Sequence, residues 1–150
     1  MQQSRLKLDH YNLSHLHIEL VPDVEAQPLG TYADFEHAAF GSDVEFRQVE
    51  LPNGEPRHTV ELKLNCKPID GRPFPYLFSI GLVGLFDGRE LDDSKRDSLV
   101  LVNGASMLYG IAREVMLGLT MRFMQGAVML PTVQFAELAM DFASVPQSEG

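Results

Sequence analysis

The sequence predicts an α+β fold, in which a four-stranded antiparallel sheet is followed by one long and one short helix within a single domain spanning residues 1–150. Four apolar or alternating segments lie in the first 86 residues, and turns containing Pro or Gly separate them. A helix-length apolar segment, residues 99–121, follows the last of these. Because the strands precede the helices instead of alternating with them, an antiparallel sheet is favoured over a parallel one.

The first two predicted strands are short. Residues 16–20 place apolar side chains at even positions and polar ones at odd positions, and a turn at Pro22 ends this alternation. The weakly patterned segment up to Gly41, which contains several Pro and Gly residues, is interpreted as a loop. Residues 44–51 form the second strand, with a change of parity after Phe46 that a β-bulge would explain.

The third and fourth strands carry clearer signals. Residues 59–67 alternate between apolar and polar side chains after an Asn53-Gly54 turn, because this pair accepts positive φ. Residues 74–86 are apolar on both faces, with Phe78 on one face and Leu77 on the other. The chain's own helices can cover only one face of the sheet. The second apolar face is therefore expected to meet a partner chain, solvent or a bound apolar ligand.

The long predicted helix is apolar on more than one face. Its main stripe repeats at steps of four and three residues, and Val102, Met107 and Ile111 add apolar side chains around the remaining circumference. A helix of this kind must be buried on more than one face, and one sheet covers only one. We therefore expect an oligomer. Its interface is predicted to include five residues of the main stripe: Leu101, Leu108, Ala112, Val115 and Leu119.

The C-terminal part of the sequence predicts a second, shorter helix. A break at Gly126 and Pro131 precedes an amphipathic segment that contains Val133, Leu138 and Phe142. Residues 1–9 and 143–150 are expected to be flexible ends.

Composition and charge exclude several classes of function. Twelve basic and 21 acidic residues give a net charge of −9, so the chain lacks the basic footprint that nucleic acid binding requires. The apolar helix is long enough to span a membrane, but Arg113 and Glu114 lie within it, where charge is costly in lipid. No signal peptide is visible, and Cys66 alone cannot form an internal disulfide. We expect a cytoplasmic protein without a membrane span.

Few residues indicate catalysis or metal binding. The sequence contains no nucleophile elbow, P-loop, zinc motif or dinucleotide fingerprint, so we predict neither an enzyme nor a cofactor. His15, His17 and Glu19 share one strand face and could offer two imidazoles and a carboxylate to zinc. A small metal-binding protein that uses these three residues stays an alternative, although polar side chains on a solvated face are the commoner case.

Several short strings, taken in order, resemble the SecB family of export chaperones. The strings are Val83-Gly84-Leu85-Phe86 at the end of the fourth strand, Leu108-Tyr109-Gly110-Ile111-Ala112-Arg113-Glu114 in the helix, and Leu130-Pro131-Thr132-Val133-Gln134-Phe135 after it. The similarity covers roughly residues 10–142 and is firmest from Thr59 onward. The order and spacing of the strings together carry the resemblance.

The resemblance implies a homotetramer, a dimer of dimers, that holds unfolded preproteins along apolar grooves before translocation and is not an enzyme. The fourth strand would line such a groove through seven residues: Phe74, Tyr76, Leu77, Phe78, Val83, Leu85 and Phe86. Glu19 matches an acidic residue that docks the SecA motor in the family, whereas His15 and Ser79 stand where further acids are expected. A SecB-like chaperone dedicated to one labile partner, such as an antitoxin, is therefore the alternative.

Overall fold

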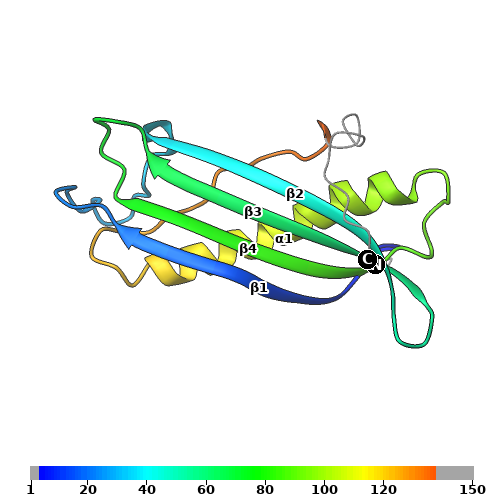
Figure 1. Cartoon of the computed structure of the whole chain (residues 1–150). Coiled ribbons are helices and arrows are strands. Elements are labelled where there is room, and N and C mark those ends of the chain that lie inside the picture. Colours follow the sequence, from blue (N-terminus) through cyan, green and yellow to red (C-terminus); the bar gives the residue numbers. More distant parts are fainter. Residues whose placement is uncertain (1–3, 138–150) are drawn as a thin grey trace.

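A computed structural model describes residues 4–137 and shows one sheet with one long helix across it (Figure 1). The elements, in chain order, are β1 (Lys7–Leu20), a 3-10 turn η1 (Phe35–His37), β2 (Ala38–Glu50), β3 (Pro56–Pro68), β4 (Tyr76–Asp87) and α1 (Arg96–Thr120). The strands pair antiparallel in the order β1-β4-β3-β2. The predicted α+β class, the antiparallel sheet and the long helix are confirmed.

The strand β1 is longer than predicted. It begins at Lys7 instead of residue 16, so residues 7–9, which were expected to belong to a flexible end, are part of the sheet. No residue of β1 is fully buried. A strand at the edge of a sheet, with both faces largely exposed, has no reason to keep a strict apolar alternation. The sequence signal for its first half is therefore weak.

The bulges lie in β1 and not in the second strand. The register of β2 with β3 is unbroken from Ala38 to Glu50, which corrects the bulge predicted within residues 44–51. β1 instead shifts register against β4 at two places, and the second shift, between Leu13 and His15, lies beside Gly81. A Cβ atom on Gly81 would lie 2.5 Å from Ser14 Oγ. The glycine therefore allows the bulged strand to approach β4 closely.

The second predicted helix falls largely outside the described residues. Residues 131–135 have no regular secondary structure, although Val133 belongs to the amphipathic pattern. Leu138, Phe142 and residues 143–150 lie beyond the described range, so the prediction for them stays a prediction.

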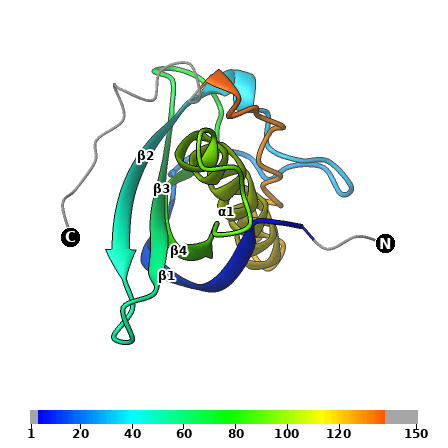
Figure 2. The same ribbon diagram turned by 90° about the vertical axis from the view of Figure 1, so that its right-hand side faces the viewer.

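The core lies between α1 and one face of the sheet, called here the inner face (Figure 2). The Phe86 ring occupies a notch left by two glycines: a Cβ on Gly84 would lie 2.6 Å from it, and one on Gly104 would lie 3.2 Å from it. Close approach of helix and sheet excludes water and packs apolar atoms densely. Within residues 4–137, no helix has the length and apolar content to cross a membrane.

The helix stripe proposed as an oligomer interface is mostly core. Leu101, Leu108 and Ala112 are 0% exposed because they pack against the chain's own sheet, so they do not form an interface. Only Val115, which is half-buried, and Leu119, which is 37% exposed, reach the surface. The periodicity identifies a buried face correctly, but it does not distinguish burial by the same chain from burial by another.

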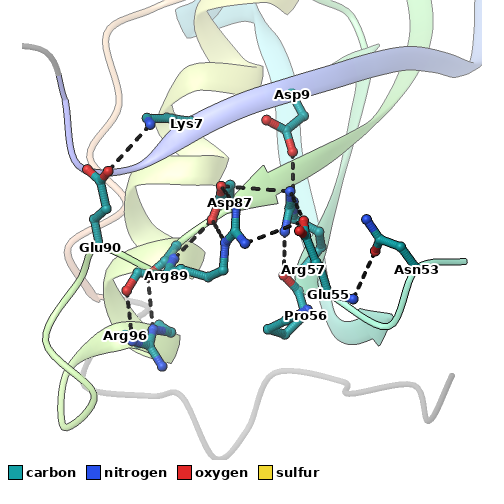
Figure 3. Close-up of polar contacts among 11 residues, drawn as sticks. Lys7, Asp9, Asn53, Glu55, Pro56, Arg57, Asp87, Arg89, Glu90 and Arg96 are labelled. Atoms are coloured by element: carbon teal, nitrogen blue, oxygen red, sulfur yellow. Dashed lines mark hydrogen bonds and ion pairs between the residues drawn. The ribbon is translucent and has the colours of Figure 1, made fainter. Parts of the chain in front are cut away.

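A network of ion pairs ties together one end of the sheet (Figure 3). The buried Arg57 of β3 donates a hydrogen bond to Asp9 of β1 at 2.9 Å and pairs with Glu55 of the preceding turn at 3.2 Å. Arg89 makes a two-pronged contact with Asp87 at the end of β4, at 3.0 and 2.9 Å. These hydrogen bonds from Arg89 lower the pKa of Asp87 to about 2. The network fixes the start of β1 against the start of β3 and the end of β4.

A pair of leucine substitutions tests which face of β4 is core. Leu82→Ala should lower the free energy of unfolding by about 2–5 kcal/mol, because Leu82 is 0% exposed beneath α1. Leu77→Ala should cost less than about 1 kcal/mol, because Leu77 is 38% exposed on the opposite face. Urea denaturation monitored by circular dichroism measures both values. Equal losses would contradict the assignment of faces.

Candidate functional site

The edge of the sheet formed by β2 is free within the described part of the chain. β2 hydrogen-bonds to β3 on one side, and no other strand of residues 4–137 pairs with it (Figure 1). Such an edge presents backbone N–H and C=O groups that can pair with another extended chain. The strand begins immediately after η1, in which the amide of Glu36 donates a hydrogen bond to the Asp34 side chain at 2.9 Å.

An open apolar hollow lies beside this edge on the outer face of the sheet, the face turned away from α1. Its volume is about 530 Å³. The lining residues are Ala39, Phe40, Gly41, Asn65, Cys66, Lys67, Leu77, Phe78 and Ser79. Ala39 and Gly41 are small, so β2 forms a low rim there, and Leu77 provides the exposed apolar side chain. We call this region the outer hollow.

A second hollow lies on the inner side of the same strand. Its volume is about 250 Å³. The lining residues are Phe40, Gly41, Ser42, Leu64, Tyr109, Val133, Gln134, Phe135 and Glu137. We call this region the inner hollow. Phe40 and Gly41 line both hollows, so the two hollows flank the same short stretch of β2.

The wall of the inner hollow is held in place from α1. The Tyr109 hydroxyl donates a hydrogen bond to the carbonyl of Pro131, and Arg113 Nε donates to the carbonyl of Leu130 at 3.0 Å. The Tyr109 ring also meets the Phe135 ring edge-on, with centroids 5.7 Å apart. Burial raises the pKa of Tyr109 to about 12, so the hydroxyl keeps its proton at physiological pH. The segment before Phe135 therefore forms a fixed wall.

This arrangement suits an extended polypeptide. A chain that adds to the edge of a sheet gains main-chain hydrogen bonds, which are independent of its sequence. Its successive side chains point to opposite faces. At β2 those two faces carry the outer and inner hollows, so alternate side chains of an added strand could enter each in turn. The site therefore offers binding to an extended chain.

The predicted client-binding residues of β4 divide between the two faces. Phe74, Tyr76 and Phe86 are 0% exposed in the core, so the prediction that they line a groove is wrong. Phe78 borders the outer hollow but is itself 1% exposed. The even-numbered side chains of β4 point toward α1, which accounts for their burial.

The odd-numbered residues of β4 point to the outer face, as the double-faced pattern predicts. Leu77 lines the outer hollow. Val83 and Leu85 are half-buried on the same face farther along β4, and neither lines either hollow beside β2. Leu77 is thus the predicted residue that the structure brings to the candidate site with an exposed side chain.

Sequence reasoning missed most of this site. Ala39, Phe40 and Gly41 belong to a segment interpreted as a loop, because its Pro and Gly residues obscure the start of β2. Tyr109 and Phe135 lie in strings that carry the resemblance, but nothing local assigns them to one hollow. Their separation in the sequence hides a contact that only the folded chain creates.

The three residues of the metal-binding alternative are not grouped as a metal site. His15 Nε2 lies 2.5 Å from Ser79 Oγ, and His17 Nε2 lies 3.4 Å from Glu19 Oε2. Among residues 4–137, no three His, Cys, Asp or Glu side chains are grouped so as to hold a metal ion. The structure therefore adds nothing to the metal hypothesis. Glu19, predicted as a motor-docking residue, is exposed near the end of β1.

Comparison with known proteins identifies the fold. No family model and no curated protein matches the sequence. The structure is similar to that of a SecB-like chaperone from Mycobacterium tuberculosis in complex with a ChAD peptide from the HigA1 antitoxin, with a TM-score of 0.54, 14% identity, and coverage of 87% of this chain and 91% of that one. A protein of unknown function from Streptococcus agalactiae gives a TM-score of 0.42 at 14% identity, covering 85% and 97%. The chain has a SecB-like fold.

Removal of one hydroxyl tests the wall of the inner hollow. Tyr109→Phe should cost about 1 kcal/mol of stability and accelerate amide hydrogen exchange in residues 126–135, because the bond to the Pro131 carbonyl is lost while the ring remains. Tyr32→Phe is the matched control, since Tyr32 is 51% exposed. Unchanged exchange in Tyr109→Phe would show that the hydroxyl does not hold the wall.

Proposed function

We propose that this protein is a chaperone that holds unfolded polypeptides, binding extended segments along the free edge of β2. The observation that carries the proposal is the pair of hollows that flank the same stretch of this edge. The SecB-like fold supports it. Main-chain hydrogen bonds form with any client sequence. The hollows add binding energy for apolar side chains, which unfolded proteins expose.

Holding acts through mass action. A protein that binds the unfolded state of a client, and not its native state, lowers the concentration of the form that folds. No phosphate-cradling loop occurs in the sequence, so we propose that retention needs no ATP. The protein acts as a binding partner in the cytoplasm and not as an enzyme.

The identity of the clients divides the proposal in two. In the export version, the clients are preproteins that pass to the translocation machinery, with Glu19 as one contact for the SecA motor. In the second version, the chaperone serves one labile partner, such as an antitoxin. The complex of the Mycobacterium protein with an antitoxin peptide supports a partner of this second kind. Proteins captured from cells by the purified chaperone would separate many clients from one.

We also propose that the protein assembles as a homotetramer, a dimer of dimers. The edge strand β1 exposes four apolar side chains toward the inner side of the sheet: Tyr11, Leu13, Leu16 and Leu20, each 40–44% exposed. These side chains, together with the exposed Leu119 of α1, are apolar surface that a second copy could bury. This replaces the interface predicted from Leu101, Leu108 and Ala112.

A substitution in the outer hollow tests client binding. Leu77→Ser should leave the fold intact but weaken the binding free energy for an unfolded client by roughly 1–2 kcal/mol, because an apolar contact is lost. The delay of refolding of a slow-folding client, with and without ATP, measures this. Leu29→Ser is the control, because Leu29 is fully exposed outside both hollows.

The two variants give opposite expectations. Leu29→Ser should delay refolding as the wild type does. The proposal fails if Leu77→Ser also retains full activity while remaining folded, or if retention of the client depends on ATP.

The assembly has its own test. Light scattering at micromolar concentration should give a mass near four times 16.8 kDa. Leu13→Asp should reduce this mass, because an interface would then bury an unpaired carboxylate at a cost of several kcal/mol. Leu29→Asp should not change it. A monomeric wild type would contradict the proposed tetramer and leave the client site as a separate question.

A further inference from the structure

The outer hollow contains a single charged side chain in its lining. Lys67 lies there beside Leu77, and no acidic residue lines the same hollow. No ion pair engages Lys67 within the described residues, whereas Lys63, four residues earlier on the same strand and face, pairs with Glu61 at 3.2 Å. The outer hollow therefore combines an apolar contact with one uncompensated positive charge.

We propose, building on the proposed function, that the outer hollow selects client segments that carry an aspartate or glutamate two positions from an apolar anchor. The anchor contacts Leu77 and the carboxylate contacts Lys67. Lys67 is thus a specificity-determining residue for clients of an otherwise acidic chaperone.

The register of the strands places these two side chains together. Cys66 of β3 is paired with Phe78 of β4, and both are buried on the inner face. Lys67 follows Cys66 and Leu77 precedes Phe78, so in an antiparallel pair they are neighbours on the outer face. In an extended segment, side chains two positions apart share a face and are about 7 Å apart. Lys67 and Leu77 face each other across the strands, and the flexible four-carbon stem of Lys67 lets its ammonium reach along the segment to a carboxylate two positions from the anchor.

The charges around the outer hollow confine the preference for a carboxylate to the end of β2 that lies beside Lys67. Farther along β2, Asp43 is opposite Lys63 and Glu45 is opposite Glu61, so the outer face becomes acidic there. The whole chain carries a net charge of −9, which repels acidic segments at long range. A carboxylate is therefore favoured beside Lys67 and disfavoured toward Asp43. This difference also favours one register of the bound segment.

Three peptides test the inference. They share an extended apolar sequence and differ at one residue, two positions from the anchor, which is Asp, Asn or Lys. Fluorescence anisotropy with the full chain at low ionic strength should show the Asp peptide binding about two- to five-fold more tightly than the Asn peptide, with the Lys peptide weakest. The Asp preference should shrink in 1 M salt, where exposed charges are screened.

Substitutions at two lysines show which side chain causes the preference for the Asp peptide. Lys67→Gln should remove the Asp preference, and Lys67→Glu should reverse it toward Lys. Lys63→Gln should retain it, because Lys63 is already paired with Glu61. An unchanged Asp-to-Asn ratio in Lys67→Gln, or loss of the preference in Lys63→Gln, would overturn the inference while leaving client binding in place. Failure of all three peptides to bind the wild type would instead overturn the proposed site itself.

Discussion

The packing of α1 on the inner face of β3 and β4 is the constraint on which the rest of the structure depends. Phe86 enters the notch between Gly84 and Gly104, and this close contact brings the whole helix against the sheet. One helix covers one face. The outer face and both edges of the sheet are left without cover from the described part of the chain, and every surface proposed here for binding follows from that asymmetry.

The two edges of the sheet have different chemistry. β1 exposes a row of large apolar side chains that includes Leu13 and Leu16, which suits burial by a second copy. β2 instead exposes small residues, such as Ala39 and Gly41, between two hollows. Small side chains permit the close approach of a variable backbone. Permanent assembly at one edge and reversible binding at the other are consistent with this difference.

Charge is distributed in a similarly uneven way. At the end of the sheet near the start of α1, the network contains Arg57 and Arg89, which pair with Asp9, Glu55 and Asp87. These charges compensate one another, so the network stabilises the fold and leaves little positive charge available to a ligand. The outer hollow carries Lys67, which has no ion-pair partner among residues 4–137. Matched charges stabilise a fixed arrangement, whereas an unmatched exposed charge is available to a ligand. The local balance therefore matters more to binding than the net charge of −9.

The sequence by itself determined the class of fold, the identity of the central strands and the length of the helix. These follow from local patterns: Leu62 and Leu64 alternate with polar residues, and Leu101 and Leu108 repeat on one helical stripe. Only the tertiary structure decided which apolar face of β4 meets α1 and therefore that Phe74 and Tyr76 are core while Leu77 is accessible. It also decided that Phe40, Tyr109 and Phe135 share one hollow. Periodicity shows that a face is apolar, but which surface covers it depends on contacts between residues far apart in the chain.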